Sequence, residues 1–258
     1  MRTIRARVHA AGLAFVALLF LGHAARAEPC QRDSFEGRDA IVCTIDPATS
    51  DLRLFWRDAS GAPYGRFDAL ARALDANGQK LAFAINAGMY DTDYAPVGLH
   101  IEEGAELHPA DTVTMDRPPG EVPNFYKQPN GVFYLSKAGA GILPTAEFLK
   151  ARPKARFATQ SGPMLVIDGR LHPAFIPNSD SRTRRSGVGV CEKGQVRFAI
   201  SETDVNFDEF ARLFRDHLAC HNALFLDGGR GSGLYARALG RNDVSGHGGY
   251  GPILGLVE

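Results

Sequence analysis

The sequence predicts an α+β protein with a large mixed or antiparallel β-sheet core and two or three helices packed on it. Short apolar segments alternate along the chain with Gly, Pro, Asn and Asp, which is typical of strands separated by turns. Few segments show the apolar spacing of a helix. No segment has the composition of a linker and no internal repeat is present, so we expect a single domain.

The predicted strands are apolar segments rich in β-branched and aromatic residues. In chain order they cover residues 40–45, 52–56, 81–85, 97–101, 131–135, 164–167, 187–191, 196–200, 223–227 and 253–257.

Helices are predicted at 67–74 and 207–218, where apolar residues recur on one face, and a shorter one at 145–151. Asn206 followed by Glu209 has the spacing of a capping box, which marks the start of the second helix. Because this helix lies between the strands at 196–200 and 223–227, a β-α-β unit with one locally parallel pairing is expected.

The N-terminus has the pattern of a secretory signal peptide. Arg2, Arg5 and Arg7 precede the apolar run 10–21, and Ala25-Arg26-Ala27 supplies small residues at a cleavage site. A membrane-spanning helix needs about 20 apolar residues, and this run is shorter. We therefore expect a signal peptide at 1–27, a processed chain at 28–258 without a membrane span, and a periplasmic or secreted location.

Charge argues against a nucleic-acid partner. The chain holds 29 basic and 29 acidic residues. The expected signal peptide contains four arginines and no acid, so the processed chain has a net charge of about −4. A nucleic-acid-binding protein needs a concentrated basic face.

The cysteines indicate disulfides. Cys30, Cys43, Cys191 and Cys220 form no CxxC pair, which disfavours zinc and thioredoxin-like sites. An even number in an oxidising compartment favours disulfides. Three pairings are possible, and we favour Cys30–Cys43 and Cys191–Cys220, the neighbours in sequence.

Candidate functional residues gather at the ends of predicted strands, where loops on a rigid scaffold commonly carry function. The clusters lie at 86–90, 160–163, 181–190, 226–235 and 246–252. Asp227 ends an apolar strand before a glycine-rich loop, and Glu202 ends another, so both are candidate bases. The arginines of 181–190 could clamp an anion, since the guanidinium fork matches phosphate or carboxylate oxygens.

Two alternative classes of site remain open. The motifs GxxxxGK[ST] and GxGxxG are absent, which disfavours a nucleotide site. Carboxylates could instead hold a divalent cation, Ca or Mg, for a metal-assisted hydrolysis, and the candidate ligands are Asp91, Asp93, Asp204 and Asp227.

Taken in order, the clusters resemble the phosphodiester glycosidase family, in a bacterial periplasmic branch. Asn-Ala-Gly-Met-Tyr at 86–90 is similar to an NGGFF-type turn, and Leu-Asp-Gly-Gly at 226–229 is similar to an LDGGGSS-type loop. Further blocks at 96–98, 130–133, 161–163, 185–189 and 251–253 resemble family blocks in the same order. Ala87, Ser186, Arg230 and Gly231 depart from the family pattern.

The resemblance implies hydrolysis of a sugar-1-phosphodiester on its sugar side, which releases a free sugar and a phosphomonoester. It implies an arginine that binds the phosphate, with Arg185 the first candidate and Arg182 the second. It also implies a carboxylate that activates water or stabilises positive charge at the anomeric carbon, with Asp227 first and Glu202 second. The expected substrate is a small or polymeric sugar phosphodiester of the envelope or an exopolysaccharide.

Contacts with the sugar and the ester are expected from the same turns. The residues concerned are Asn86, Gly88, Asn130, Gln160, Ser161, Gly162, Gly228, Gly229, Ser232 and His247. The competing interpretation is a non-catalytic carbohydrate- or envelope-polymer-binding protein on the same fold.

Overall fold

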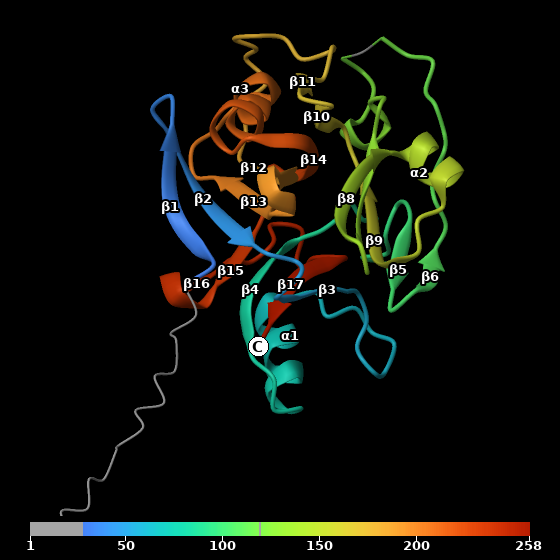
Figure 1. Cartoon of the computed structure of the whole chain (residues 1–258), viewed down its shortest axis with the longest axis vertical. Helices are drawn as coiled ribbons and strands as arrows, with labels where there is room; N and C mark the ends of the chain where they lie inside the picture. Colours follow the sequence, from blue (N-terminus) through green and yellow to red (C-terminus); the bar gives the residue numbers. More distant parts are fainter. Residues whose placement is uncertain (1–27, 119) are drawn as a thin grey trace, which may run out of the picture.

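The computed structural model describes residues 28–118 and 120–258, and the expected signal peptide at 1–27 lies outside them. Three sheets of antiparallel strands surround a common core, and three α-helices pack on the outside. In Figure 1, α3 lies at the top, α2 at the right and α1 at the bottom. This is the predicted α+β single domain.

The largest sheet has seven strands in the order β1-β2-β13-β12-β14-β10-β11. Their bounds are Cys30–Phe35 (β1), Arg38–Ile45 (β2), Val196–Ser201 (β13), Arg185–Cys191 (β12), Cys220–Gly228 (β14), Met164–Ile167 (β10) and Arg170–Leu171 (β11). The expected locally parallel pairing is wrong. Strand β12 lies between β13 and β14 and pairs antiparallel with both, so the intervening helix crosses over β12.

The other two sheets have five strands each, in the orders β16-β15-β4-β17-β3 and β6-β5-β9-β7-β8. The first comprises Arg241–Asn242 (β16), Leu234–Ala236 (β15), Leu81–Asn86 (β4), Ile253–Val257 (β17) and Asp51–Phe55 (β3). The second comprises Ala105–His108 (β6), His100–Glu102 (β5), Ala155–Ser161 (β9), Gly131–Ser136 (β7) and Gly139–Pro144 (β8). The strand expected at 97–101 is only partly formed, since β5 begins at His100.

The predicted helices are all present. They are Phe67–Asp75 (α1), Thr145–Ala151 (α2) and Phe207–Arg212 (α3), and α3 continues into a π-helical turn at Leu213–His217. Short 3-10 turns lie at Asn124–Tyr126, Glu192–Gly194, Gly229–Gly231 and Arg237–Leu239. The capping box is confirmed, because the Asn206 side chain accepts from the Glu209 N–H at 2.9 Å while Glu209 accepts from the Asn206 N–H. Among the described helices, none is long and apolar enough to cross a membrane.

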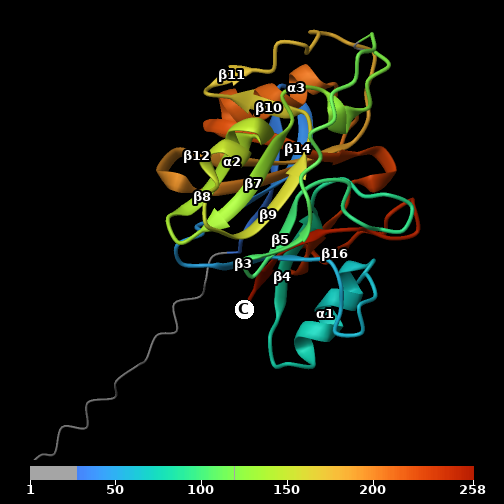
Figure 2. The same cartoon turned by 90° about the vertical axis from the view of Figure 1, so that its right-hand side faces the viewer.

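The inner faces of the three sheets meet in one hydrophobic core. Phe83 of β4, Phe133 of β7 and Phe198 of β13 come from different sheets and are almost fully buried. The Phe198 ring centroid lies 5.0 Å from that of Phe83 and 6.1 Å from that of Phe133. Each sheet also has an outer face, covered by α3, α1 or α2 (Figures 1 and 2).

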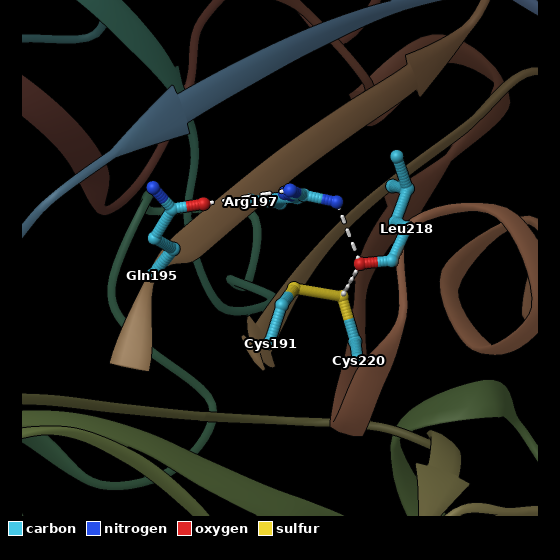
Figure 3. Close-up of a disulfide and its surroundings, with 5 residues drawn as sticks. All are labelled: Cys191, Gln195, Arg197, Leu218 and Cys220. Atoms are coloured by element: carbon cyan, nitrogen blue, oxygen red, sulfur yellow. Dashed lines mark hydrogen bonds between the residues drawn. A yellow bond between two sulfur atoms is a disulfide. The ribbon is translucent and has the colours of Figure 1, made fainter. Parts of the chain in front are cut away.

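Both predicted disulfides are confirmed. Cys30–Cys43 joins β1 to β2, and Cys191–Cys220 joins β12 to β14. Beside the second bond, the Arg197 guanidinium donates to the Leu218 carbonyl at 2.7 Å (Figure 3). The entry to β14 is therefore fixed both covalently and by an arginine from β13.

Removing a disulfide should destabilise the fold, and somewhat more where the enclosed loop is longer. Replacing both members of Cys191–Cys220 by Ala should lower the free energy of unfolding by roughly 3.5 kcal/mol, and replacing Cys30 and Cys43 by roughly 3 kcal/mol. Urea unfolding of each double variant measures this. Unchanged midpoints would contradict the chain-entropy argument, and a reductant, which opens both bonds, should destabilise the unsubstituted protein more than either double substitution does.

Candidate active site

Four of the predicted clusters meet at one end of the central core. The Ser161 hydroxyl at the end of β9 donates to the Leu226 carbonyl of β14 at 2.9 Å. The Gly233 N–H donates to Asn86 Oδ1 at the end of β4 at 3.0 Å. The Tyr90 hydroxyl donates to the Gly249 carbonyl before β17 at 2.9 Å. Turns from all three sheets therefore adjoin, and in Figure 2 the loops following β4 and β14 project to the right.

Asp227 is the candidate acid–base residue of this region. It lies near the end of β14, half-buried, and its Oδ1 accepts the Gly228 N–H at 2.7 Å. Burial disfavours the ionised form and raises the pKa of Asp227 to about 6, although the Gly228 bond opposes the shift. Close to neutral pH, such a carboxyl can both accept and release a proton.

The Tyr90 hydroxyl lies near this acid. Burial and the charge of Asp227 raise the pKa of Tyr90 to about 12, and a contact with Ser245 Oγ at 3.3 Å opposes the shift. Tyr90 therefore keeps its proton at physiological pH and serves as a hydrogen-bond donor.

The loop after Asp227 packs directly on the carboxylate. A Cβ added to Gly231 would lie 2.0 Å from Asp227 Oδ2, so this position tolerates no side chain without movement. Arg230 is exposed and its Nε donates to the Gly246 carbonyl at 2.9 Å. Both departures from the family pattern in this loop thus have a local role. Gly231 lets the backbone approach Asp227, and Arg230 joins the loop to the turn before β17.

Two buried donors beside the same loop have no hydrogen-bond partner, Asn86 Nδ2 and the Tyr250 hydroxyl. Both lie against Gly233. A Cβ on Gly233 would lie 1.9 Å from the Tyr250 oxygen, and the Gly233 N–H donates to Asn86 Oδ1. An unpaired buried donor costs about 1–3 kcal/mol. A polar ligand that accepts from both would remove this cost.

Arg185 does not face Asp227, and the expectation that the two share one bound ester is wrong. Arg185 is buried on the outer, α3 side of the sheet, where its guanidinium carbon lies 3.8 Å from the Phe207 ring centroid. Its Nε donates to the Val205 carbonyl at 2.9 Å, and burial lowers its pKa to about 10. The next residue, Ser186, pairs with Asp227, and paired residues of antiparallel strands share a face.

Arg182 is not free to bind a phosphate either. Its two terminal nitrogens each donate to a Glu209 oxygen at 2.7 Å. Glu209 belongs to α3, so this bidentate pair also lies on the outer side of the sheet. The second expectation for the phosphate-binding arginine is therefore replaced by a structural role.

Arg184 precedes β12, and its side chain reaches the loop that follows Asp227, because it contacts Asp243, which accepts the Leu234 N–H at the end of that loop. The Arg184 side chain is 35% exposed, and its contacts are long: 3.3 Å to Asp243, 3.4 Å to the Ser201 carbonyl and 3.9 Å to Glu202. Arg241 binds Glu202 at 2.7 Å and also contacts Asp243. Glu202 is thus held between two arginines, which suits it to orient Arg184 rather than to accept a proton.

The expected amide and hydroxyl contacts are mostly used within the protein. The Gln160 amide donates to the Asp111 carbonyl at 2.7 Å and accepts from two backbone N–H groups. Asn130 Nδ2 donates to the Phe125 carbonyl at 3.0 Å. With Ser161 bound to Leu226, these three side chains brace the turns, and their predicted role as sugar donors is corrected. Ser232 Oγ lies 3.3 Å from the Gly229 carbonyl, within the Asp227 loop.

The glycines of the clusters are required by close packing. A Cβ on Gly88 would lie 2.3 Å from the Gln160 carbonyl oxygen, and one on Gly162 would lie 2.6 Å from Asn130 Cβ. Gly228 packs on the Arg184 carbonyl, and Gly229 has a φ of +56°. His247 is exposed at the rim, where its carbonyl accepts from the Tyr94 hydroxyl.

The carboxylates suggested as cation ligands do not come together. Across residues 28–118 and 120–258, no three His, Cys, Asp or Glu side chains form a group that could hold a metal ion. Asp91 Oδ1 instead accepts the N–H groups of Asp93 and Ala95, both at 2.9 Å, which makes it a turn former.

The sequence analysis included Tyr90, Arg184 and Tyr250 in its candidate clusters but gave none of them a role of its own, and it missed Asp243. Their roles carry no local signal, because the groups that they contact come from distant turns.

Solved structures share this fold at low identity. The catalytic domain of zebrafish N-acetylglucosamine-1-phosphodiester α-N-acetylglucosaminidase, auto-inhibited by its pro-peptide, superposes with a TM-score of 0.59 at 16% identity, over 88% of this chain and 81% of that chain. A hypothetical protein from Synechocystis gives 0.56 at 17% identity, over 88% and 61% of the two chains. A putative exported protein from Burkholderia pseudomallei gives 0.54 at 14% identity, over 85% and 74%.

Sequence comparison places the chain more narrowly. The uncharacterized protein YigE of Escherichia coli K12 is 36% identical over 185 residues, 72% of this chain and 70% of that protein. The sequence profile of the phosphodiester glycosidase family matches residues 79–253, which include β4, β14 and the turns that meet around Asp227. The chain belongs to the phosphodiester glycosidase family.

Proposed function

We propose that this protein hydrolyses sugar-1-phosphodiesters at the bond between the anomeric carbon and the phosphate oxygen, releasing a free sugar and a phosphomonoester. The single observation that carries the proposal is the placement of Asp227, a carboxyl with a pKa of about 6, at the start of a loop whose far end is joined through Asp243 to Arg184. Family membership supplies the reaction class.

In the proposed reaction, the anomeric C–O bond breaks and its electron pair stays on the phosphate oxygen. Asp227 in its ionised form takes the proton of the attacking water, or stabilises the positive charge that develops on the sugar. The phosphate is an acidic leaving group, so it needs little protonation. A single carboxylate near neutral pKa therefore meets the main demand for proton transfer.

Arg184 is proposed to bind the phosphodiester in place of Arg185. Its guanidinium contacts lie at 3.3 Å from Asp243, 3.4 Å from the Ser201 carbonyl and 3.9 Å from Glu202, and because these contacts are long, moving onto a phosphate costs little. The phosphate gains negative charge as the bond breaks, and a guanidinium aimed at it stabilises the transition state more than the substrate.

Asn86 and Tyr250 are proposed to donate to the sugar. Both present buried donors without partners next to the Asp227 loop, and neutral donors suit hydroxyl oxygens. The two disulfides fit an oxidising compartment. We therefore propose an envelope or exopolysaccharide component as the substrate of the exported protein.

Replacing Asp227 by Asn should lower kcat by about 10²–10⁴ on an N-acetylglucosamine-1-phosphodiester, because the amide cannot take a proton. The fold should persist, since the change removes a buried charge. Turnover assays and thermal unfolding of the disulfide-intact protein measure both. Retained turnover would remove Asp227 from the chemistry, whereas absent turnover in the unsubstituted protein with retained ligand binding would favour the binding-protein alternative.

The pH profile should follow the Asp227 carboxyl. Because the ionised form is the active one, kcat/KM should rise with pH through about 6 and level off above it. The phosphodiester itself does not titrate in this range. A profile that instead falls as pH rises through 6 would mean that Asp227 acts as a proton donor.

Replacing Arg184 by Lys should raise KM and lower kcat, together reducing kcat/KM by about 10–100-fold, because a point charge cannot reproduce the bidentate fork. The matched control is Arg182→Lys, which keeps a cation opposite Glu209 on the outer side of the sheet. Equal losses in the two variants would show that the proposed phosphate contact is wrong.

A further inference from the structure

A cavity lies on the α3 side of the molecule, and Asp227 is not among its walls. It has a volume of about 470 Å³, and its walls include Lys127, His172, Phe175, Ile176 and Phe207. We propose that this cavity binds an amphipathic anion, a phosphate or carboxylate head carried on an apolar body.

The apolar part of the proposal rests on a continuous stack of planar groups along the cavity. The Phe175 ring is nearly parallel to that of Phe207, with centroids 5.0 Å apart and an interplanar angle of 12°. His172 stacks on Phe175 at 4.9 Å, and the Arg185 guanidinium lies 3.8 Å from the Phe207 centroid. Ile176 is 68% exposed at the rim and extends the apolar wall to the mouth of the cavity. The surface suits a hydrocarbon or aromatic group.

The anionic part rests on Lys127 and Arg185, whose side-chain hydrogen bonds go to neutral acceptors. Lys127 lines the cavity, with its Nζ 5.6 Å from the Phe207 centroid and 3.0 Å from Asn124 Oδ1. Burial and the charge of Arg185 both lower the pKa of Lys127. Arg185 itself donates to the carbonyls of Val205 and Ser181. Lys127 and Arg185 therefore repel each other, and each hydrogen-bonds only to neutral acceptors. An anion in the cavity would relieve this repulsion.

The charged residues that line the cavity also favour an anionic ligand. Among the described residues that line the cavity, none is an Asp or Glu, while Arg117 and Lys127 are basic. The exposed Asp204 is the acid that acts on Arg185. A cationic group would therefore meet no counter-charge on these walls.

His172 orients the wall but does not add charge. Its Nε2 lies 2.9 Å from the Gln128 carbonyl, and its Nδ1 accepts the Ala174 N–H at 3.2 Å. This arrangement uses both nitrogens in the neutral form, and burial with the charge of Lys127 lowers the pKa of His172. Lys127 is left as the group that meets the head of the ligand.

This site is independent of the proposed hydrolysis. Ser181 lines the cavity, whereas Arg184 of the same segment contacts Asp243, at the end of the loop that follows Asp227. An Asp227→Asn protein should therefore bind the amphiphile unchanged.

The experiment is calorimetric titration of the full disulfide-linked protein with octyl phosphate below its micelle concentration. Octanoate tests a carboxylate head, inorganic phosphate the head alone, and octyl glucoside the apolar body alone. We expect binding of one octyl phosphate, with octyl glucoside and inorganic phosphate each at least ~10-fold weaker. Equal affinity for octyl phosphate and octyl glucoside would overturn the anion site.

Lys127→Met keeps the length of the side chain and removes its charge, so octyl phosphate should bind ~10-fold more weakly while octyl glucoside is unaffected. Lys150→Met, on the exposed end of α2, is the matched control and should bind normally. Because Lys127 is partly buried, the exposed Ile176→Glu provides a second variant that should fold and repel the anion. Unchanged affinity in both Lys127→Met and Ile176→Glu would refute the proposal.

Discussion

The packing of three sheets around one core is the constraint on which the rest of the structure depends. Phe83, Phe133 and Phe198 each belong to a different sheet and meet in this core. Once their strands are fixed, the ends of β4, β9 and β14 must lie at one end of the molecule. Turns that are distant in sequence, at 86–90, 160–162 and 227–233, therefore become neighbours without any local signal that pairs them.

A single bulge decides which groups face one another at that end. Ser186 pairs with Asp227 and Gly187 with Phe225, so Leu226 is an extra residue in β14. In a regular strand, Asp227 would share a face with Phe225 and therefore with Arg185. The bulge returns Asp227 to the inner face, where it faces the candidate site. Arg185 stays on the outer face, where it packs on Phe207.

Local patterns predicted the elements well and the site only in part. Apolar runs and the Asn206 capping box located the helices, and most strands were recognised, because these signals lie within a few residues. Strand β9 was missed because its buried half carries Thr159, Gln160 and Ser161, whose side-chain partners lie in segments distant in sequence. The same long-range bonds explain why Gln160 was mistaken for a ligand contact, and a bulge such as that at Leu226 leaves no mark in the alternation of residues.

Keeping Asp227 half-buried has a consequence for stability as well as for chemistry. Its pKa in the folded protein is about 6, above the ordinary value for an aspartate in an unfolded chain. The folded state therefore binds the proton more tightly, so this group stabilises the fold fully only below the unfolded pKa, and that stability is lost as pH rises through about 6. The loss is roughly 3 kcal/mol, similar to the gain from one disulfide. Cys191–Cys220 closes the other end of the same β12–β14 pair, so the covalent bond can offset the cost of holding an ionised carboxylate where the family's chemistry needs it.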